Sequence, residues 1–356
     1  MLINLHPPLA DMRQLVIEGM GRQPRQLPAW LLYDAEGARL FEAICEQPEY
    51  GLTRTETALL EERAPELAAA LGPGVLVEFG AGNARKVGPL LAALQPRAYA
   101  ALDISLQQLE QACRALQRQH PQVPVLGICC DYSLLEQLPD QPLLTGRRLG
   151  FYPGSSLGNF EPEAARMLLR QFRRLLGPGG RLLIGIDQPK AEARLEAAYN
   201  DQAGVSAAFA SNLLVRLNRD LNGTFDPEAF CYRAWWDGGH SRITMALVSQ
   251  VEQTVELAGH RWRFTIGEPL ITEHSVKYTP QAFTDLAAAA GWRALRRWHD
   301  PADDLSLHLL EQADSDHTPT GDTEDRGHGP AGTAGGDAGD ARGPDRRAGG
   351  PLPAGL

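Results

Sequence analysis

The stretch that determines the fold is Val75–Gly82, VLVEFGAG, in which a short apolar run is followed directly by two glycines. The run has the length and composition of a buried strand. Gly80 and Gly82 would let the backbone turn sharply into a helix and let a ligand approach without a Cβ in the way. A Gly-x-Gly pair alone is a weak signal, so a tight turn without a ligand remains an alternative. The stretch predicts the first strand of an α/β fold.

The same rhythm continues beyond Gly82. Further apolar runs of strand length are Ala98–Ile104, Pro124–Ile128, Arg148–Tyr152 and Arg181–Ile186. Segments with apolar residues at helical spacing are Leu90–Leu94, Leu106–Gln119, Tyr132–Leu138 and Pro162–Leu176. Strands that alternate with helices predict a doubly wound, mostly parallel sheet that is covered on both faces.

A different pattern begins near Lys190. It combines a helical stretch with strand-like runs, in the order Ala191–Arg219, Ile243–Val251 and Thr254–Ile266. Thr279-Pro280 then predicts a helix start, and Gly291 predicts its end. Two short strand candidates follow, Arg297–Asp300 and Leu305–Leu310. An α/β core interrupted by an insert is the simplest interpretation.

Composition limits the classes of protein that fit. The 356 residues predict about two domains, and a net charge of −10 does not favour nucleic-acid binding. Five scattered cysteines without a Cys-x-x-Cys motif argue against a disulfide framework and against a metal site, and they favour a reducing cytoplasm. The sequence shows no signal-peptide pattern at its start, and it has no apolar run long enough to predict a membrane span. Residues 312–356, rich in Gly and Pro, are expected to form a disordered tail.

Two acidic residues, together with the glycine turn, predict a binding site for a nucleoside. Asp103 ends the second strand, where a carboxylate binds ribose hydroxyls, and Asp131 ends the third, where it accepts from an adenine amino group. A dinucleotide site expects a third glycine where this chain has Arg85, which argues against a nicotinamide oxidoreductase. The Glu78-x-Gly-x-Gly form resembles the first motif of class I S-adenosylmethionine-dependent methyltransferases.

Five other segments are more particular: Tyr33–Phe41, Pro48–Glu56, Gly154–Asn159, Tyr199–Phe209 and Ile271–Tyr278. In this order and spacing they resemble the histidine Nα-methyltransferases of ergothioneine biosynthesis, which make hercynine, over about residues 20–311. The resemblance implies a class I (Rossmann-like) core with a C-terminal antiparallel hairpin and a smaller α+β substrate domain. We expect the division to be 1–57 (with the substrate domain), 58–189 (core), 190–278 (substrate-binding insert) and 279–311 (completion of the core).

The resemblance also implies residue roles. The expected S-adenosylmethionine-binding residues are Glu78, Gly80, Gly82, Lys86, Asp103, Asp131 and Tyr132. The expected catalytic residues are Tyr33, Tyr50, Asn159 and Tyr199, of which Asn159 and Tyr199 match the pair that grips the substrate's amino-acid end. Tyr50, Asn159 and Tyr199 also belong to the substrate-binding set, with Met245, Glu273 and Ser275 at the imidazole pocket. The family's Tyr-Tyr-Pro reads Tyr50-Gly51-Leu52 here.

Elementary chemistry makes these roles plausible. Methyl transfer needs a neutral amine held about 3 Å from the methyl carbon, in line with the departing sulfur, and requires no metal. Tyrosine faces tolerate a cationic product by cation–π attraction. Plainer interpretations remain: Asn159 as a helix cap, Lys277 as a surface or ion-pair residue, and His274 as a non-ligand facing away from the site.

Several alternatives remain open. The nearest keeps the fold and changes the amino acid, for instance to tryptophan, although a buried Glu273 carboxylate would be wasted against an indole. A nucleic-acid methyltransferase is disfavoured because Gly158-Asn159-Phe160 lacks the Asn-Pro-Pro-Tyr type of element that meets a flipped base. A non-catalytic sensor is the last alternative. We expect a cytoplasmic monomer that acts on free histidine, with no nucleic-acid or membrane partner.

Overall fold

Val75–Phe79 forms β3, the strand at which the order of the large sheet reverses. The computed structural model describes residues 1–5 and 11–313. The large sheet has the order β1 (Leu2–Asn4), β5 (Val125–Cys129), β4 (Ala98–Asp103), β3, β6 (Arg148–Tyr152), β7 (Arg181–Asp187), β14 (Leu305–Gln312) and β13 (Trp292–His299). Strands β1 to β7 of this sheet are parallel, and β14 runs antiparallel to both β7 and β13. The mostly parallel sheet with an antiparallel C-terminal hairpin is confirmed.

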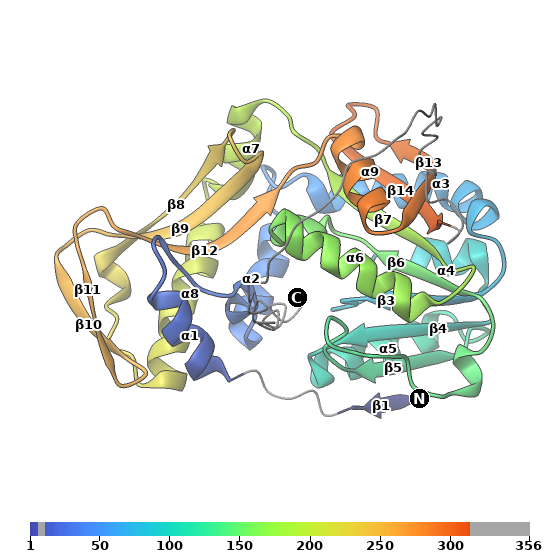
Figure 1. Ribbon diagram of the computed structural model, residues 1–356, viewed down its shortest axis with the longest axis horizontal. Helices are drawn as coiled ribbons and strands as arrows, with labels where there is room; N and C mark the ends of the chain where they lie inside the picture. The colour runs from blue at the N-terminus through green and yellow to red at the C-terminus, as the bar shows by residue number, and fades with distance from the viewer. Residues whose placement is uncertain (6–10, 314–356) are drawn as a thin grey trace, which may run out of the picture.

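Helices cover both faces of this sheet because successive strand residues point to opposite sides. Val75 and Val77 of β3 join one hydrophobic cluster, whereas Leu76 joins the other. The first cluster includes side chains of α6 (Pro162–Leu176) and α9 (Pro280–Ala289). The second includes side chains of α3 (Leu52–Leu71), α4 (Gly88–Leu94) and α5 (Leu106–Gln119). These elements form the α/β lobe, which lies on the right in Figure 1.

A smaller lobe lies beside it, on the left in Figure 1. Its sheet has the order β2 (Arg25–Gln26), β12 (Pro269–Val276), β9 (Arg242–Ser249) and β8 (Phe230–Asp237). A separate hairpin joins β10 (Gln253–Leu257) to β11 (His260–Phe264). The remaining helices are α1 (Met12–Met20), α2 (Ala35–Cys45), α7 (Glu192–Tyr199) and α8 (Val205–Leu221), and the 3₁₀ helices are Ala29–Leu32, Pro142–Leu144, Ser156–Asn159 and Pro227–Ala229.

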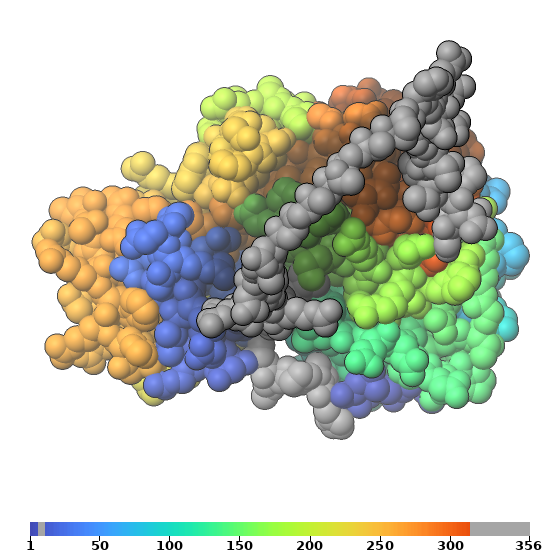
Figure 2. Space-filling model, viewed as in Figure 1, coloured from blue at the N-terminus to red at the C-terminus, as the bar shows by residue number. Residues whose placement is uncertain are grey.

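Segments distant in sequence build this smaller lobe. Arg25 of β2 pairs with Glu268 at 2.8 Å and donates to the Arg263 carbonyl, which ties the N-terminal segment to residues just before β12. The space-filling view shows the blue N-terminal segment against the orange β10–β11 region (Figure 2). The N-terminal segment and the insert thus fold together, as hydrophobic contacts between α2 and α8 also indicate.

Three expectations about local structure are wrong. Leu2–Asn4 does not join the smaller lobe but adds β1 to the large sheet beside β5. Tyr132–Leu138 is not helical: both the backbone N–H and the hydroxyl of Ser133 donate to the Asp131 carboxylate, which closes a turn instead. Gln312 was expected in the tail, yet it is the last residue of β14.

The predicted disordered tail lies outside the described residues from residue 314 onward. Within the described part of the chain, no helix is both long and apolar enough to cross a bilayer.

Candidate active site

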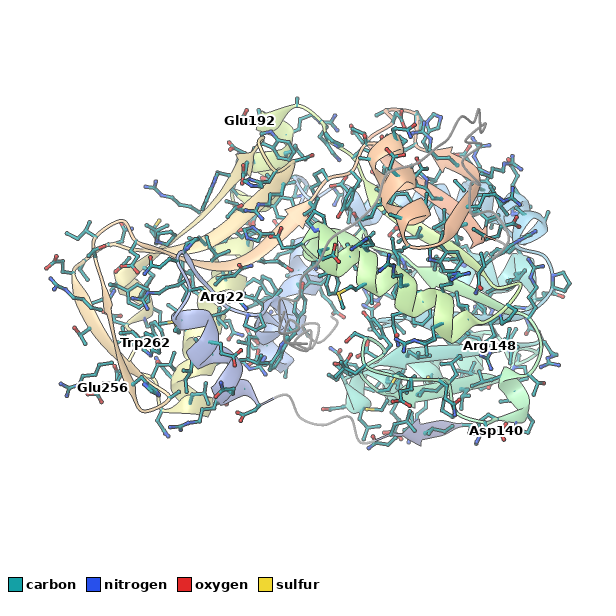
Figure 3. All side chains as sticks on the ribbon, in the orientation of Figure 1. Arg22, Asp140, Arg148, Glu192, Glu256 and Trp262 are labelled. Carbon is teal, nitrogen blue, oxygen red and sulfur yellow. The ribbon has the colours of Figure 1, made fainter. Side chains whose placement is uncertain are left out.

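A cavity of about 450 Å³ lies where the two lobes meet. The α/β lobe contributes the loops that follow β3 and β6, and the smaller lobe contributes β9, β12 and the end of α7. Strands β3 and β6 are neighbours at the point where strand order reverses, so the loops after them diverge and leave a crevice. Glu256 and Asp140 mark the opposite outer ends of the molecule, away from this crevice (Figure 3).

The cavity brings together all but two of the predicted site residues. Those that line it are Tyr33, Tyr50, Glu78, Gly80, Gly82, Lys86, Asp103, Asn159, Tyr199, Met245, Glu273 and Ser275. Asp131 and Tyr132 do not line it. The Asp131 carboxylate accepts from Ser133, and the Tyr132 ring packs edge-on against Phe79 in the core, with the ring centroids 5.7 Å apart.

The glycine turn leaves open space against the cavity. Gly82 has a φ of +52°, and a Cβ built on it would meet no atom within 4 Å. Its N–H donates to Asp103 Oδ2 at 2.8 Å, and Ser105 N–H donates to Oδ1 at 2.8 Å. Burial raises the pKa of Asp103, while these backbone donors oppose the rise. A carboxylate has about four acceptor positions, so Asp103 retains capacity for ligand hydroxyls.

Two buried glutamates hold the turn and its neighbouring loops in place. The Tyr99 hydroxyl donates to Glu78, and burial raises the pKa of Glu78 to about 8. Glu56, fully buried on α3, accepts from Lys86 Nζ at 2.7 Å and from Gly154 N–H at 2.8 Å. Glu56 fixes the loops after β3 and β6 to each other. Sequence reasoning gave it no role, although it ends the quoted Pro48–Glu56 segment.

Aromatic rings form the wall contributed by the N-terminal segment and α8. The centroid of Tyr33 lies 5.2 Å from that of Phe209 and 5.5 Å from that of Phe41, and Tyr50 contacts Tyr199 edge-on at 5.9 Å. Burial raises the pKa of the Tyr33 and Tyr50 phenols, so both are neutral near pH 7. Phe41 and Phe209 were not predicted as site residues. They end two of the quoted segments, which was the available signal.

Strand β12 supplies the polar end of the cavity. Glu273 and Ser275 both line it, and Met245 of β9 lies directly opposite Glu273 in the register. Burial raises the pKa of Glu273 to about 8, and its Oε1 has no hydrogen-bond partner among the described residues. His274 is directed elsewhere, with Nδ1 3.1 Å from Thr244 Oγ1. An unpartnered buried oxygen is costly unless a ligand donates to it.

Of two plainer interpretations, the one for Asn159 is wrong and the one for Lys277 is confirmed in part. Asn159 is not a helix cap, because Glu161 occupies the N-cap position of α6. Lys277 is not a surface residue: its side chain is fully buried, and its Nζ lies 2.6 Å from Asp187 Oδ2. The ion-pair alternative for Lys277 is the one that the structure supports.

The residues around the turn fit an adenosyl sulfonium. Gly82 leaves room for a close backbone approach, and Asp103 presents free acceptor positions beside it. Lys86, partly exposed in the cavity wall, offers a cation near the same turn. Among the described residues, no group of three or more His, Cys, Asp or Glu is arranged to hold a metal ion.

Comparison with known proteins decides the family. Residues 12–312 match the model of a family described as "Histidine-specific methyltransferase, SAM-dependent". This chain belongs to that histidine-specific methyltransferase family. The match covers both lobes, so the whole two-lobed structure is that of an S-adenosylmethionine-dependent methyltransferase.

The proteins that this chain resembles carry names that indicate different substrates. The chain is 36% identical to the histidine N-alpha-methyltransferase of Mycobacterium tuberculosis over 84% of this chain and 94% of that protein. It is 31% identical to ergothioneine biosynthesis protein 1 of Neurospora crassa over 82% of this chain and 33% of that protein. It is also 27% identical to the 4-dimethylallyltryptophan N-methyltransferase of Epichloe festucae var. lolii, over 83% of this chain and 94% of that protein. The histidine-specific methyltransferase family thus has relatives that act on an indole amino acid.

Proposed function

We propose that this chain converts L-histidine to hercynine by moving three methyl groups, one at a time, from S-adenosylmethionine to the α-amine, in ergothioneine biosynthesis. The observation that carries the proposal is the pair on β12. The unpartnered Oε1 of Glu273 and the hydroxyl of Ser275 stand together in the wall of a cavity that Gly82 and Asp103 also line. The names of the mycobacterial and Neurospora relatives support the same substrate and pathway.

In this proposal the polar pair recognises the imidazole ring. Glu273 accepts a ring N–H, and Ser275 bonds the second ring nitrogen. Met245 packs against the ring from the neighbouring strand. The two polar side chains lie on one face of β12, which fits a flat ring with two nitrogen atoms.

The other predicted residues orient the α-amine for transfer. S-Adenosylmethionine supplies an activated methyl group on a sulfonium. Asn159 and Tyr199 hold the amino-acid end of the substrate, and both line the cavity. Burial of the amine in the apolar part of the cavity disfavours the hydrated ammonium and so helps the amine lose its proton. The ring faces of Tyr33 and Tyr50 stabilise the cationic product by about 0.5–2 kcal/mol through cation–π attraction.

The cofactor side is assigned in the same way. Glu78, Gly80, Gly82, Lys86 and Asp103 contact S-adenosylmethionine from the turn after β3 and the end of β4. Asp131 and Tyr132 lie after β5, the next strand in the sheet, and we assign them to the adenine end. Their side chains do not line the cavity, so contact there involves backbone atoms or a movement of the Asp131 turn.

We also infer the roles of the two lobes, the oligomeric state and the cellular compartment. Residues 2–4, 58–189 and 279–312 form the methyltransferase core, whereas 11–57 and 190–278 bind the substrate. We infer a monomer that acts on a free amino acid rather than on nucleic acid, since a net charge of −10 does not favour nucleic-acid binding. All five cysteines are free thiols, which supports a reducing cytoplasm.

The rival substrate is tryptophan or a derivative, as in the Epichloe relative. The pair of Glu273 and Ser275 favours histidine, because an indole has one N–H for Glu273 but no second ring nitrogen for Ser275. Calorimetric titration of histidine and of tryptophan, each with S-adenosylhomocysteine present, distinguishes the two. We expect histidine to bind more tightly. Tighter binding of tryptophan would remove histidine as the substrate.

A further inference from the structure

Lys277 is a buried cation beside the polar end of the cavity that the proposed function does not use. It follows β12, and its side chain is fully buried. Its backbone N–H donates to the Ser241 carbonyl at 2.7 Å, and the Ser241 hydroxyl donates back to the Lys277 carbonyl at 2.7 Å. Lys277 does not line the cavity. Contacts outside the cavity therefore hold Lys277 in place.

The ammonium of Lys277 uses all three of its donors. Nζ lies 2.6 Å from Asp187 Oδ2, 2.7 Å from the Tyr199 hydroxyl and 2.8 Å from Ser275 Oγ. Asp187, at the end of β7, also accepts from Lys190 at 2.7 Å through its other oxygen. The attraction of Asp187 raises the pKa of Lys277 despite burial, so the ammonium stays charged. One cation thus links the α/β lobe to two residues that line the cavity.

This network determines which way the Ser275 hydroxyl points. Tyr199 donates its O–H to Ser275 Oγ at 2.9 Å, as expected because a phenol is the stronger donor of the two hydroxyls. With Lys277 donating as well, both lone pairs of Ser275 Oγ are occupied. No acceptor for the Ser275 hydrogen is present among the described residues. Because Oγ lies at the cavity, this hydrogen is available to a ligand.

We propose that Lys277 is a positioning residue that makes Ser275 a hydrogen-bond donor toward the ring of the substrate. The proposal rests on the proposed function and adds a ring preference to it. With Glu273 as acceptor and Ser275 as donor, the pocket matches a neutral ring that carries one N–H and one bare nitrogen. Imidazole has this pattern, whereas an indole offers Ser275 no bare nitrogen.

The test is calorimetric titration of histidine into the full-length chain saturated with S-adenosylhomocysteine. Lys277→Met should weaken histidine binding about ten- to a hundredfold, the range for losing charge-assisted hydrogen bonds. Lys190→Met is the matched control, because it removes the same charge from the same Asp187 but contacts neither hydroxyl. We expect Lys190→Met to change the dissociation constant less than about threefold.

A double-mutant cycle separates positioning from a structural role. If Lys277 acts through Ser275, the loss in Lys277→Met/Ser275→Ala should be smaller than the product of the two single losses by at least about threefold. S-Adenosylhomocysteine affinity should stay within about twofold of wild type, because Lys277 does not contact that end of the cavity. In steady-state assays, the effect should appear mainly in the KM for histidine rather than in the KM for the methyl donor.

Each contrary result is informative. The proposal is wrong if Lys277→Met leaves histidine binding within threefold of wild type, if Lys190→Met causes an equal loss, or if the cycle is multiplicative. If Lys277→Met does not fold, Asp187→Asn/Lys277→Met removes both buried charges and carries the same prediction. Failure of both variants to fold would make Lys277 a residue of the fold and overturn the proposal. Wild-type chain that does not bind histidine at all refutes the proposed function instead.

Discussion

Replacing Glu273 by Gln tests substrate recognition most selectively. Gln has nearly the same shape and keeps one acceptor oxygen, but it cannot carry the negative charge that Glu273 holds above its pKa of about 8. Glu273 is buried at the cavity, and its Oε1 has no partner among the described residues, so a ring N–H would be its first hydrogen bond. A hydrogen bond to a charged group contributes about 1.5–3 kcal/mol, which corresponds to about 10- to 100-fold in the dissociation constant. We expect Glu273→Gln to weaken histidine binding by that factor at pH 9, where the buried carboxyl with its pKa of about 8 is ionised.

The assay is calorimetric titration with S-adenosylhomocysteine present, and the control is Glu256→Gln. Glu256 lies on β10 at the outer end of the smaller lobe (Figure 3), half exposed and paired with Arg261, so its loss should leave binding unchanged. S-Adenosylhomocysteine affinity should be the same in both variants. Histidine affinity that survives Glu273→Gln would show that this carboxylate does not meet the ring, and the assignment of the imidazole pocket would be refuted.

Three further predictions concern the turn, its support and pH. Gly82→Ala should weaken S-adenosylhomocysteine binding severalfold in calorimetry, because Ala is strained at positive φ and its Cβ enters the open space; unchanged affinity would place the ligand elsewhere. Lys86→Met should lower the free energy of unfolding by about 3 kcal/mol in urea titration, because it leaves Glu56 buried without its cation; a loss below about 1 kcal/mol contradicts this. Burial raises the pKa of Glu273 to about 8. Between about pH 4.5 and 8, the folded chain therefore keeps a proton on this carboxyl that the unfolded chain has lost. The stability of the folded state falls as the pH rises across this window. The melting temperature of Glu273→Gln should therefore exceed that of wild type more at pH 8.5 than at pH 5, and an equal difference at both values would disprove the ionisation.

The core of the fold was predictable because its signals are local. Val75–Phe79 and Arg148–Tyr152 are apolar runs buried on both faces, and the structure places them as adjacent parallel strands. The N-cap Thr279 and the stop at Gly291 mark α9 correctly, with the Thr279 hydroxyl accepting from Ala282 N–H. Where periodicity and turn chemistry agree, the sequence is sufficient.

The failures share a different cause. Phe230–Asp237 was not recognised as a strand because only two of its eight residues are buried and its charged and aromatic side chains lack clean alternation. Leu2–Asn4 is too short to show any period, and its pairing with β5 depends on contacts more than a hundred residues away. Tyr132–Leu138 has helical spacing, but the Asp131 side chain captures Ser133 and forms a turn.

The sequence predicted which residues line the site better than which residues contact one another around it. Family resemblance named 12 of the residues that line the cavity, whereas the roles of Glu56 and Lys277 depend on distant partners. Lysine is usually exposed, and only the approach of Asp187, Tyr199 and Ser275 in three dimensions accounts for its burial here. Sequence spacing alone carries no information about such long-range ion pairs.

The most direct measurement of the central claim is product analysis. The purified chain is incubated with S-adenosylmethionine and an equimolar mixture of the free amino acids, and methylated products are identified by mass spectrometry with fragmentation. We expect histidine to gain one, two and finally three methyl groups, all on the α-nitrogen. Methylation of the imidazole ring, preferential methylation of tryptophan, or no methylated amino acid at all would refute the proposed function.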